Sequence, residues 1–115
     1  MRRETRDERR ETGDGDRYQM ITHIVFFKLA DPFPEMIAAT RDRLLGMKGK
    51  IGEIRHLEVG ADVIRSERSY DLALVARFDS LADLRIYQEH PVHAGDVVPY
   101  VKSVCSSIVA VDYES

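Results

Sequence analysis

The sequence predicts an α+β fold of the ferredoxin-like type, with a four-stranded antiparallel sheet and its helices on one face. Segments with strand and helix periodicity follow one another in the order β-α-β-β-α-β between residues 21 and 113. Clusters of Pro, Gly, Asp and Ser separate these segments. This order is that of the split βαβ motif, so we expect the strands to lie in the order 4-1-3-2.

The length and composition suit one domain with its own core. A chain of 115 residues buries enough apolar surface to fold without disulfides or a structural metal. The net charge of −3 argues against nucleic acid as a partner, because phosphate binding requires a concentrated basic face. No apolar run approaches the roughly 20 residues that span a bilayer. Charged residues directly follow Met1, so we expect no signal peptide.

The number of cysteines indicates the redox state of the cellular compartment. Cys105 is the single cysteine of the chain, and one thiol cannot form an internal disulfide. A reducing compartment is the simplest interpretation, and we expect a cytoplasmic protein. Cys105 itself is expected to be a buried small residue of the last strand.

Residues 1–19 differ in composition from the rest of the chain. They contain six arginines and six acidic residues but almost no apolar side chains. Such a segment cannot offset its ordering entropy by packing. We therefore predict a charged, flexible extension over 1–19 and a folded domain over 20–115. A frayed helix over 2–12 is an alternative, since some of the charges lie at helical spacing.

Four segments have the composition of β-strands. Residues 21–29 (ITHIVFFKL) are rich in β-branched and aromatic side chains, and residues 70–78 (YDLALVARF) alternate most clearly. Residues 54–59 and 106–113 complete the set.

Two main helices connect these strands. Pro34 suits the first turn of one helix. Its apolar face repeats at spacings of three or four residues: Phe33, Ile37, Thr40, Leu44 and Met47. The other helix begins at a capping box formed by Ser80 and Asp83 and ends near His90. Pro91 breaks it and can begin a further short helix to about residue 101.

Both faces of the predicted sheet are apolar at the centre, whereas helices cover only one. In the third strand, Leu72 and Leu74 point one way while Ala73 and Val75 point the other. The first and last strands alternate apolar residues in the same manner. An uncovered apolar face marks an interface, so we predict a face-to-face homodimer. A lid formed by residues 1–19 is a weaker alternative, because that segment lacks apolar residues.

Several motifs resemble the stress-responsive A/B barrel (Dabb) family. They are HIVFFKL at 23–29, LEVGAD at 57–62, YDLAL at 70–74, YQEHPVH at 87–93 and VDY at 111–113. The resemblance covers residues 20–114 and implies a dimeric α/β barrel with a cavity between sheet and helices in each protomer. One departure is Ile51-Gly52-Glu53-Ile54, where the family often has Ile-Pro-Gly-Ile. That loop and the shape of a nearby pocket therefore differ from the family pattern.

The resemblance also implies candidate catalytic residues. The best-known enzymes of this type are plant polyketide cyclases similar to olivetolic acid cyclase, which close a linear poly-β-keto thioester by aldol condensation. Their catalytic tyrosine and histidine fall on Tyr87 and His93, and a further histidine and aspartate fall on His23 and Asp112. His93 would act as general base, and Tyr87 would donate a hydrogen bond to an enolate oxygen. The 4-1-3-2 order places the start of strand one beside the end of strand four, so Asp112 can orient His23.

Three further residues are candidate contacts for a bound molecule: Phe27, Tyr70 and His90. His90 precedes Pro91 and equally suits a helix cap. His90, His93 and Asp96 form an H-x-x-H-x-x-D run, but Pro91 distorts that helix and only one carboxylate lies close. We expect no metal and no cofactor.

Two main functional classes stay open at this point. The first, which we favour, is a homodimer that binds a small apolar or carbonyl-containing molecule without a reaction of its own. The second is a cofactor-independent cyclase or lyase acting on such a compound. Cofactor-free monooxygenases share a similar barrel shape, but no residue singles them out. An enzyme of the second class requires a cavity of roughly 300 Å³ or more, with Tyr87 and His93 both in reach of one ligand atom.

Overall fold

The sheet has the predicted topology. The computed structural model describes residues 20–115, so the expectation for residues 1–19 lies outside the described part. The four strands are β1 (Ile21–Leu29), β2 (His56–Ala61), β3 (Leu72–Phe78) and β4 (Cys105–Glu114). They form one antiparallel sheet in the order β2-β3-β1-β4, which confirms the expected 4-1-3-2 arrangement.

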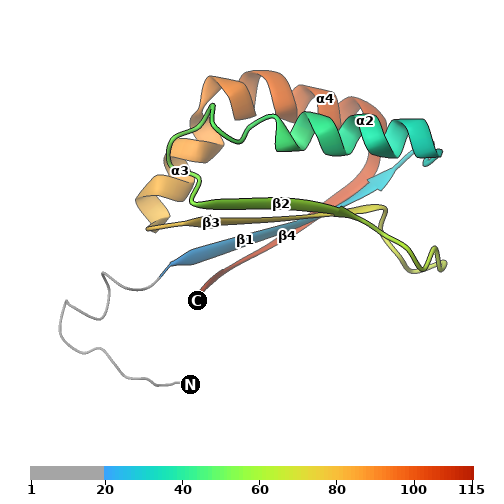
Figure 1. The fold of residues 1–115 in the computed structure, drawn as a ribbon, viewed down its shortest axis with the longest axis horizontal. Helices are drawn as coiled ribbons and strands as arrows, with labels where there is room; N and C mark the ends of the chain where they lie inside the picture. The colour runs from blue at the N-terminus through green and yellow to red at the C-terminus, as the bar shows by residue number, and fades with distance from the viewer. Residues whose placement is uncertain (1–19) are drawn as a thin grey trace.

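The helices all lie on one face of this sheet, as Figure 1 shows. They are α2 (Pro34–Leu45), α3 (Leu81–Glu89), the π-helix η1 (Pro91–Val97) and α4 (Val98–Val104). The predicted cap of α3 is confirmed, because the Asp83 backbone N–H donates to the Ser80 hydroxyl at 3.1 Å. Within residues 20–115, none of the helices combines the length and apolarity that a membrane span requires.

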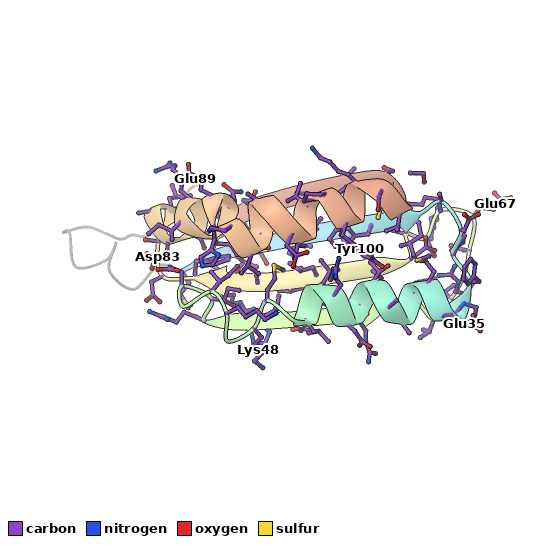
Figure 2. All side chains as sticks on the ribbon, turned by 90° about the horizontal axis from the view of Figure 1, so that it is seen from above. Glu35, Lys48, Glu67, Asp83, Glu89 and Tyr100 are labelled. Carbon is purple, nitrogen blue, oxygen red and sulfur yellow. The ribbon has the colours of Figure 1, made fainter. Side chains whose placement is uncertain are left out.

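The hydrophobic core lies between the sheet and the helices. The alternation predicted for β3 is confirmed, since Leu72, Leu74, Ala76 and Phe78 are all buried there. From the helix layer, Leu44 of α2 packs onto this surface. Tyr100 of α4 lies between α4 and α2 (Figure 2), where its hydroxyl is 3.2 Å from Thr40 Oγ1. This contact fixes the two helices against each other.

The opposite face of the sheet carries an uncovered apolar patch. Register pairs Phe26 of β1 with Ala73 on one side and Val109 on the other, so the three side chains share that face. Phe26 is 42% exposed, Val109 44% and Val111 59%. The prediction that both faces are apolar is therefore confirmed. No helix within residues 20–115 covers this second face.

Two strands, β2 and β3, begin two residues later than predicted. β3 begins at Leu72 rather than residue 70, because the Asp71 side chain takes over the hydrogen bonding at the end of β1. Its carboxylate accepts the Leu29 N–H at 2.7 Å, while the Asp71 N–H donates to the Phe27 carbonyl at 2.9 Å. β2 begins at His56 and continues through Gly60, since pairing with β3 extends to Ala61.

The segment after α3 is a π-helix, which the sequence pattern did not predict. His90 ends α3 in an extended conformation and its ring Nδ1 accepts the Val92 N–H at 3.1 Å. The His90 carbonyl accepts the Ala94 N–H at 2.7 Å. The new helix therefore begins at Pro91 with its own cap, and η1 leads directly into α4.

Candidate functional site: a cavity between the sheet and the helices

A cavity of about 280 Å³ lies between the helix-facing side of the sheet and the helices. This volume is close to, and slightly below, the lower bound expected for a cyclase substrate. Its wall is mostly apolar, with side chains of β1, β3 and β4 on one side and of α2, α3, η1 and α4 on the other. The polar side chains on the wall are His23, Tyr87, Gln88, His93 and Lys102.

Tyr87 is the most deeply buried of these polar side chains. It lies on the inner face of α3, is 1% exposed and packs against the Phe78 ring at a centroid distance of 4.9 Å. None of the hydrogen bonds formed among residues 20–115 uses its hydroxyl. Burial raises the pKa of Tyr87 well above its usual value, and the Asp112 carboxylate raises it further. The hydroxyl therefore stays protonated at neutral pH and can donate a hydrogen bond into the cavity.

His93 lies beside Tyr87, with 4.4 Å between the ring centroids. Its Nδ1 is 3.0 Å from the Gln88 carbonyl oxygen. A carbonyl oxygen only accepts, so Nδ1 carries the proton and Nε2 of the neutral ring keeps its lone pair. Burial lowers the pKa of His93, and the nearby His23 lowers it further. The hydrogen bond to the Gln88 carbonyl raises this pKa, but by less than burial lowers it. His93 thus favours the neutral form that accepts a proton.

His23 and Asp112 meet across the β1–β4 pairing. The two residues are direct register partners, and His23 Nδ1 lies 2.5 Å from Asp112 Oδ1. This confirms the contact that the strand order predicted. The His23 ring lines the cavity and faces the edge of Tyr87 at a centroid distance of 5.8 Å. The carboxylate accordingly fixes the orientation of His23 from behind the cavity wall.

Phe27 also lines the cavity, whereas the other two candidate contacts do not. Tyr70 lies on the opposite side of the sheet, where its ring is 6.2 Å from Phe26 and its hydroxyl 3.0 Å from Ser107 Oγ. The strand alternation that would align Tyr70 with Leu72 does not reach it, because β3 begins only at Leu72. The expectation that Tyr70 shares a site with Phe27 is therefore wrong.

His90 does not line the cavity either. Its Nδ1 is used in capping η1, which agrees with the alternative assignment of a helix cap. Its side chain therefore organises the backbone that carries His93, and it makes no contact with the cavity.

Comparisons with known proteins identify the family. A family model described as Stress responsive A/B Barrel Domain matches residues 21–115. The chain belongs to the Dabb family. A curated relative is a stress-response A/B barrel domain-containing protein of Arabidopsis thaliana, 29% identical over 96 residues. That match covers 83% of this chain but only 36% of the relative, so the chain spans about a third of that protein.

Solved structures with the same fold support this assignment. A dimeric protein of unknown function with a ferredoxin-like fold from Bacteroides fragilis is 32% identical, with a TM-score of 0.72 over 84% of this chain and 96% of that one. A hydroxynitrile lyase from Passiflora edulis is 18% identical, with a TM-score of 0.73 over 84% of this chain and 93% of that one. The second likeness is one of fold alone.

Two polar wall residues of this Dabb domain were not predicted as site residues. Gln88 was overlooked although it follows Tyr87, and its backbone carbonyl sets the tautomer of His93. Lys102 was overlooked because the sequence does not define the course of the chain after Pro91, where η1 leads directly into α4 and α4 lines the cavity.

The H-x-x-H-x-x-D run forms no ligand set. Within the described residues, 20–115, no three His, Cys, Asp or Glu side chains gather in a way that would hold a metal ion. Asp96 instead faces Arg43 of α2, with 3.6 Å between Oδ1 and Nη2.

Cys105 is half-buried and packs against the core, so it is less deeply buried than expected. Burial raises the pKa of its thiol, and the negative charge of Asp71 raises that pKa further.

Proposed function

We propose that this Dabb domain is a homodimer that binds a small apolar, carbonyl-containing molecule in the cavity of each protomer. The observation that carries this proposal is the Tyr87 hydroxyl, which is buried at an apolar cavity and has no hydrogen-bond partner among residues 20–115. A buried polar group normally has a partner, so a ligand acceptor at this position is the simplest explanation. A carbonyl oxygen supplies that acceptor, and the apolar wall suits the rest of the molecule.

The uncovered face of the sheet supports the dimer. Phe26, Val109 and Val111 form an exposed apolar patch, and a second copy would remove it from water. The similar protein from Bacteroides fragilis is described as dimeric. An interface on this face leaves the cavity open, since the cavity lies on the helix side. The lone thiol of Cys105 is consistent with a cytoplasmic location.

A second candidate is a cyclase-like enzyme, which the pairing of Tyr87 with His93 favours. His93 Nε2 would remove a proton from a carbon next to a carbonyl group. Tyr87 would donate a hydrogen bond to the resulting enolate oxygen. The enolate carbon would attack a second carbonyl carbon of the same molecule, whose C=O π bond would open to an alkoxide that takes the proton back from His93. The opposite pKa shifts of the two residues keep the base neutral and the donor protonated at pH 7.

Binding is tested with 4-phenylbutan-2-one, a neutral ketone of fitting size. We expect titration of the ¹⁵N-labelled protein to shift the amide signals of residues around the cavity. Tyr87→Phe should weaken binding about fivefold, the loss expected for one hydrogen bond of about 1 kcal/mol. Tyr70→Phe is the matched control and should bind normally, because its hydroxyl lies on the other side of the sheet. Equal behaviour of the two variants would overturn the proposal.

The cyclase candidate is tested on a tetraketide-CoA. His93→Ala should abolish enzymatic ring closure, and His56→Ala should leave it intact, since His56 is exposed on β2 and pairs with Glu58. Unchanged turnover in His93→Ala would reject His93 as the base.

A further inference from the structure

The cavity wall has an unusual charge composition. The chain has 20 aspartates and glutamates, yet none of the described residues lining the cavity is an aspartate or glutamate. The ionisable groups on the wall other than the Tyr87 hydroxyl are all basic: His23, His93 and Lys102. A wall of this kind favours a ligand that carries negative charge.

Lys102 is the group that supplies positive charge at neutral pH. His23 is already balanced by Asp112, and His93 favours its neutral form. Lys102 lies in the last turn of α4, and none of the ion pairs within residues 20–115 uses its ammonium group. Its side chain is exposed overall while lining the cavity, which places it at the solvent side of the site. The cavity therefore has a buried hydrogen-bond donor at Tyr87 and a solvent-exposed cation at Lys102.

We propose that the ligand is an oxo acid, with its carbonyl oxygen at the Tyr87 hydroxyl and its carboxylate at Lys102. This rests on the proposed function, because it assigns the second polar group of the same ligand. A cavity of 280 Å³ accommodates on the order of ten non-hydrogen atoms, if each takes the ~30 Å³ of a liquid water. A short apolar chain between the two polar groups fits that size and the apolar wall.

The test compares 6-oxoheptanoate with its methyl ester, which keeps the ketone and removes the charge. At low ionic strength, calorimetry on the full chain should show the acid binding about fivefold more tightly than the ester. Lys102→Met keeps the aliphatic stem and should abolish this preference without changing the affinity for the ester. Lys48→Met is the control, because Lys48 is an exposed lysine beyond the end of α2 (Figure 2) and does not line the cavity.

The outcomes separate the two proposals. Equal affinities of acid and ester for the unchanged protein would overturn the oxo-acid assignment and leave ketone binding standing. A preference that survives in Lys102→Met would also overturn it, and a lowered melting temperature would then assign Lys102 to stabilising the end of α4. Absence of binding by the acid, its ester and 4-phenylbutan-2-one would reject the proposed function itself.

Discussion

Two buried polar residues, Asp71 and Tyr87, differ in how their polar atoms are satisfied. The Asp71 carboxylate is 2% exposed, accepts the Leu29 N–H at 2.7 Å and accepts a hydrogen bond from Arg65 Nη2 at 2.8 Å. The Tyr87 hydroxyl is as deeply buried but has no such partner among residues 20–115. A fully bonded group stabilises the fold, whereas an unbonded one at a cavity is available to a ligand. Asp71 is therefore assigned to stability and Tyr87 to binding.

We expect Asp71→Ala to lower the free energy of unfolding by about 2–4 kcal/mol, because it leaves the Leu29 N–H without its buried acceptor and leaves Arg65 with Asp62 alone as its carboxylate partner. Asp79→Ala removes an exposed pair with Arg55 and should cost less than about 1 kcal/mol. Urea unfolding measures both. Similar losses in the two variants would show that the Asp71 network contributes no more than a surface pair.

His93 predicts a pH dependence of stability. Its pKa is lowered in the folded protein from 6.5, so the unfolded chain binds more protons as the pH falls below that value. The stability contributed by neutral His93 is thus present above pH 6.5 and is lost as the pH falls from there through the lower folded pKa. Urea unfolding at pH 7.5 and 5.5 should show a smaller decrease for His93→Gln than for the unchanged protein. An equal decrease would assign the pH dependence to other groups.

At the scale of elements, η1 depends on His90. His90→Ala removes the acceptor of the Val92 N–H and should lower the free energy of unfolding by about 1 kcal/mol. His90→Asn retains a side-chain acceptor and should therefore keep most of the free energy of unfolding that His90→Ala loses. The Ala variant should also weaken ketone binding, because His93 in the first turn of η1 packs against the Tyr87 ring. Equal stability of the Ala and Asn variants would exclude the capping role.

The strands and their faces could be predicted because alternation reports directly on burial. The alternation of apolar residues in β3 predicted which face of the sheet the helices cover. The strand order predicted that His23 and Asp112 lie next to each other. The π-helix could not be predicted, since no periodic pattern in the sequence distinguishes its i→i+5 bonding from that of an α-helix. For the same reason Lys102 was overlooked. Tyr87 and His93 were found through their family motif, and their mutual contact required the three-dimensional structure.

At the scale of the whole molecule, we assign ligand binding and dimerisation to opposite faces of the sheet. The helix side holds the cavity, and the other side carries the apolar patch that we assign to the homodimer. A substitution on one face should therefore leave the other function intact. Val109→Glu places a charge in the patch and should dissociate the dimer, while the affinity for 4-phenylbutan-2-one stays within about twofold because Val109 does not line the cavity.

Sedimentation equilibrium of the unchanged protein at micromolar concentration tests the central claim most directly. We predict a mass of twice 13.2 kDa for the unchanged protein and about 13.2 kDa for Val109→Glu. A mass of one chain for the unchanged protein would contradict the account, because the apolar face of the sheet would then be stable in water without a second copy.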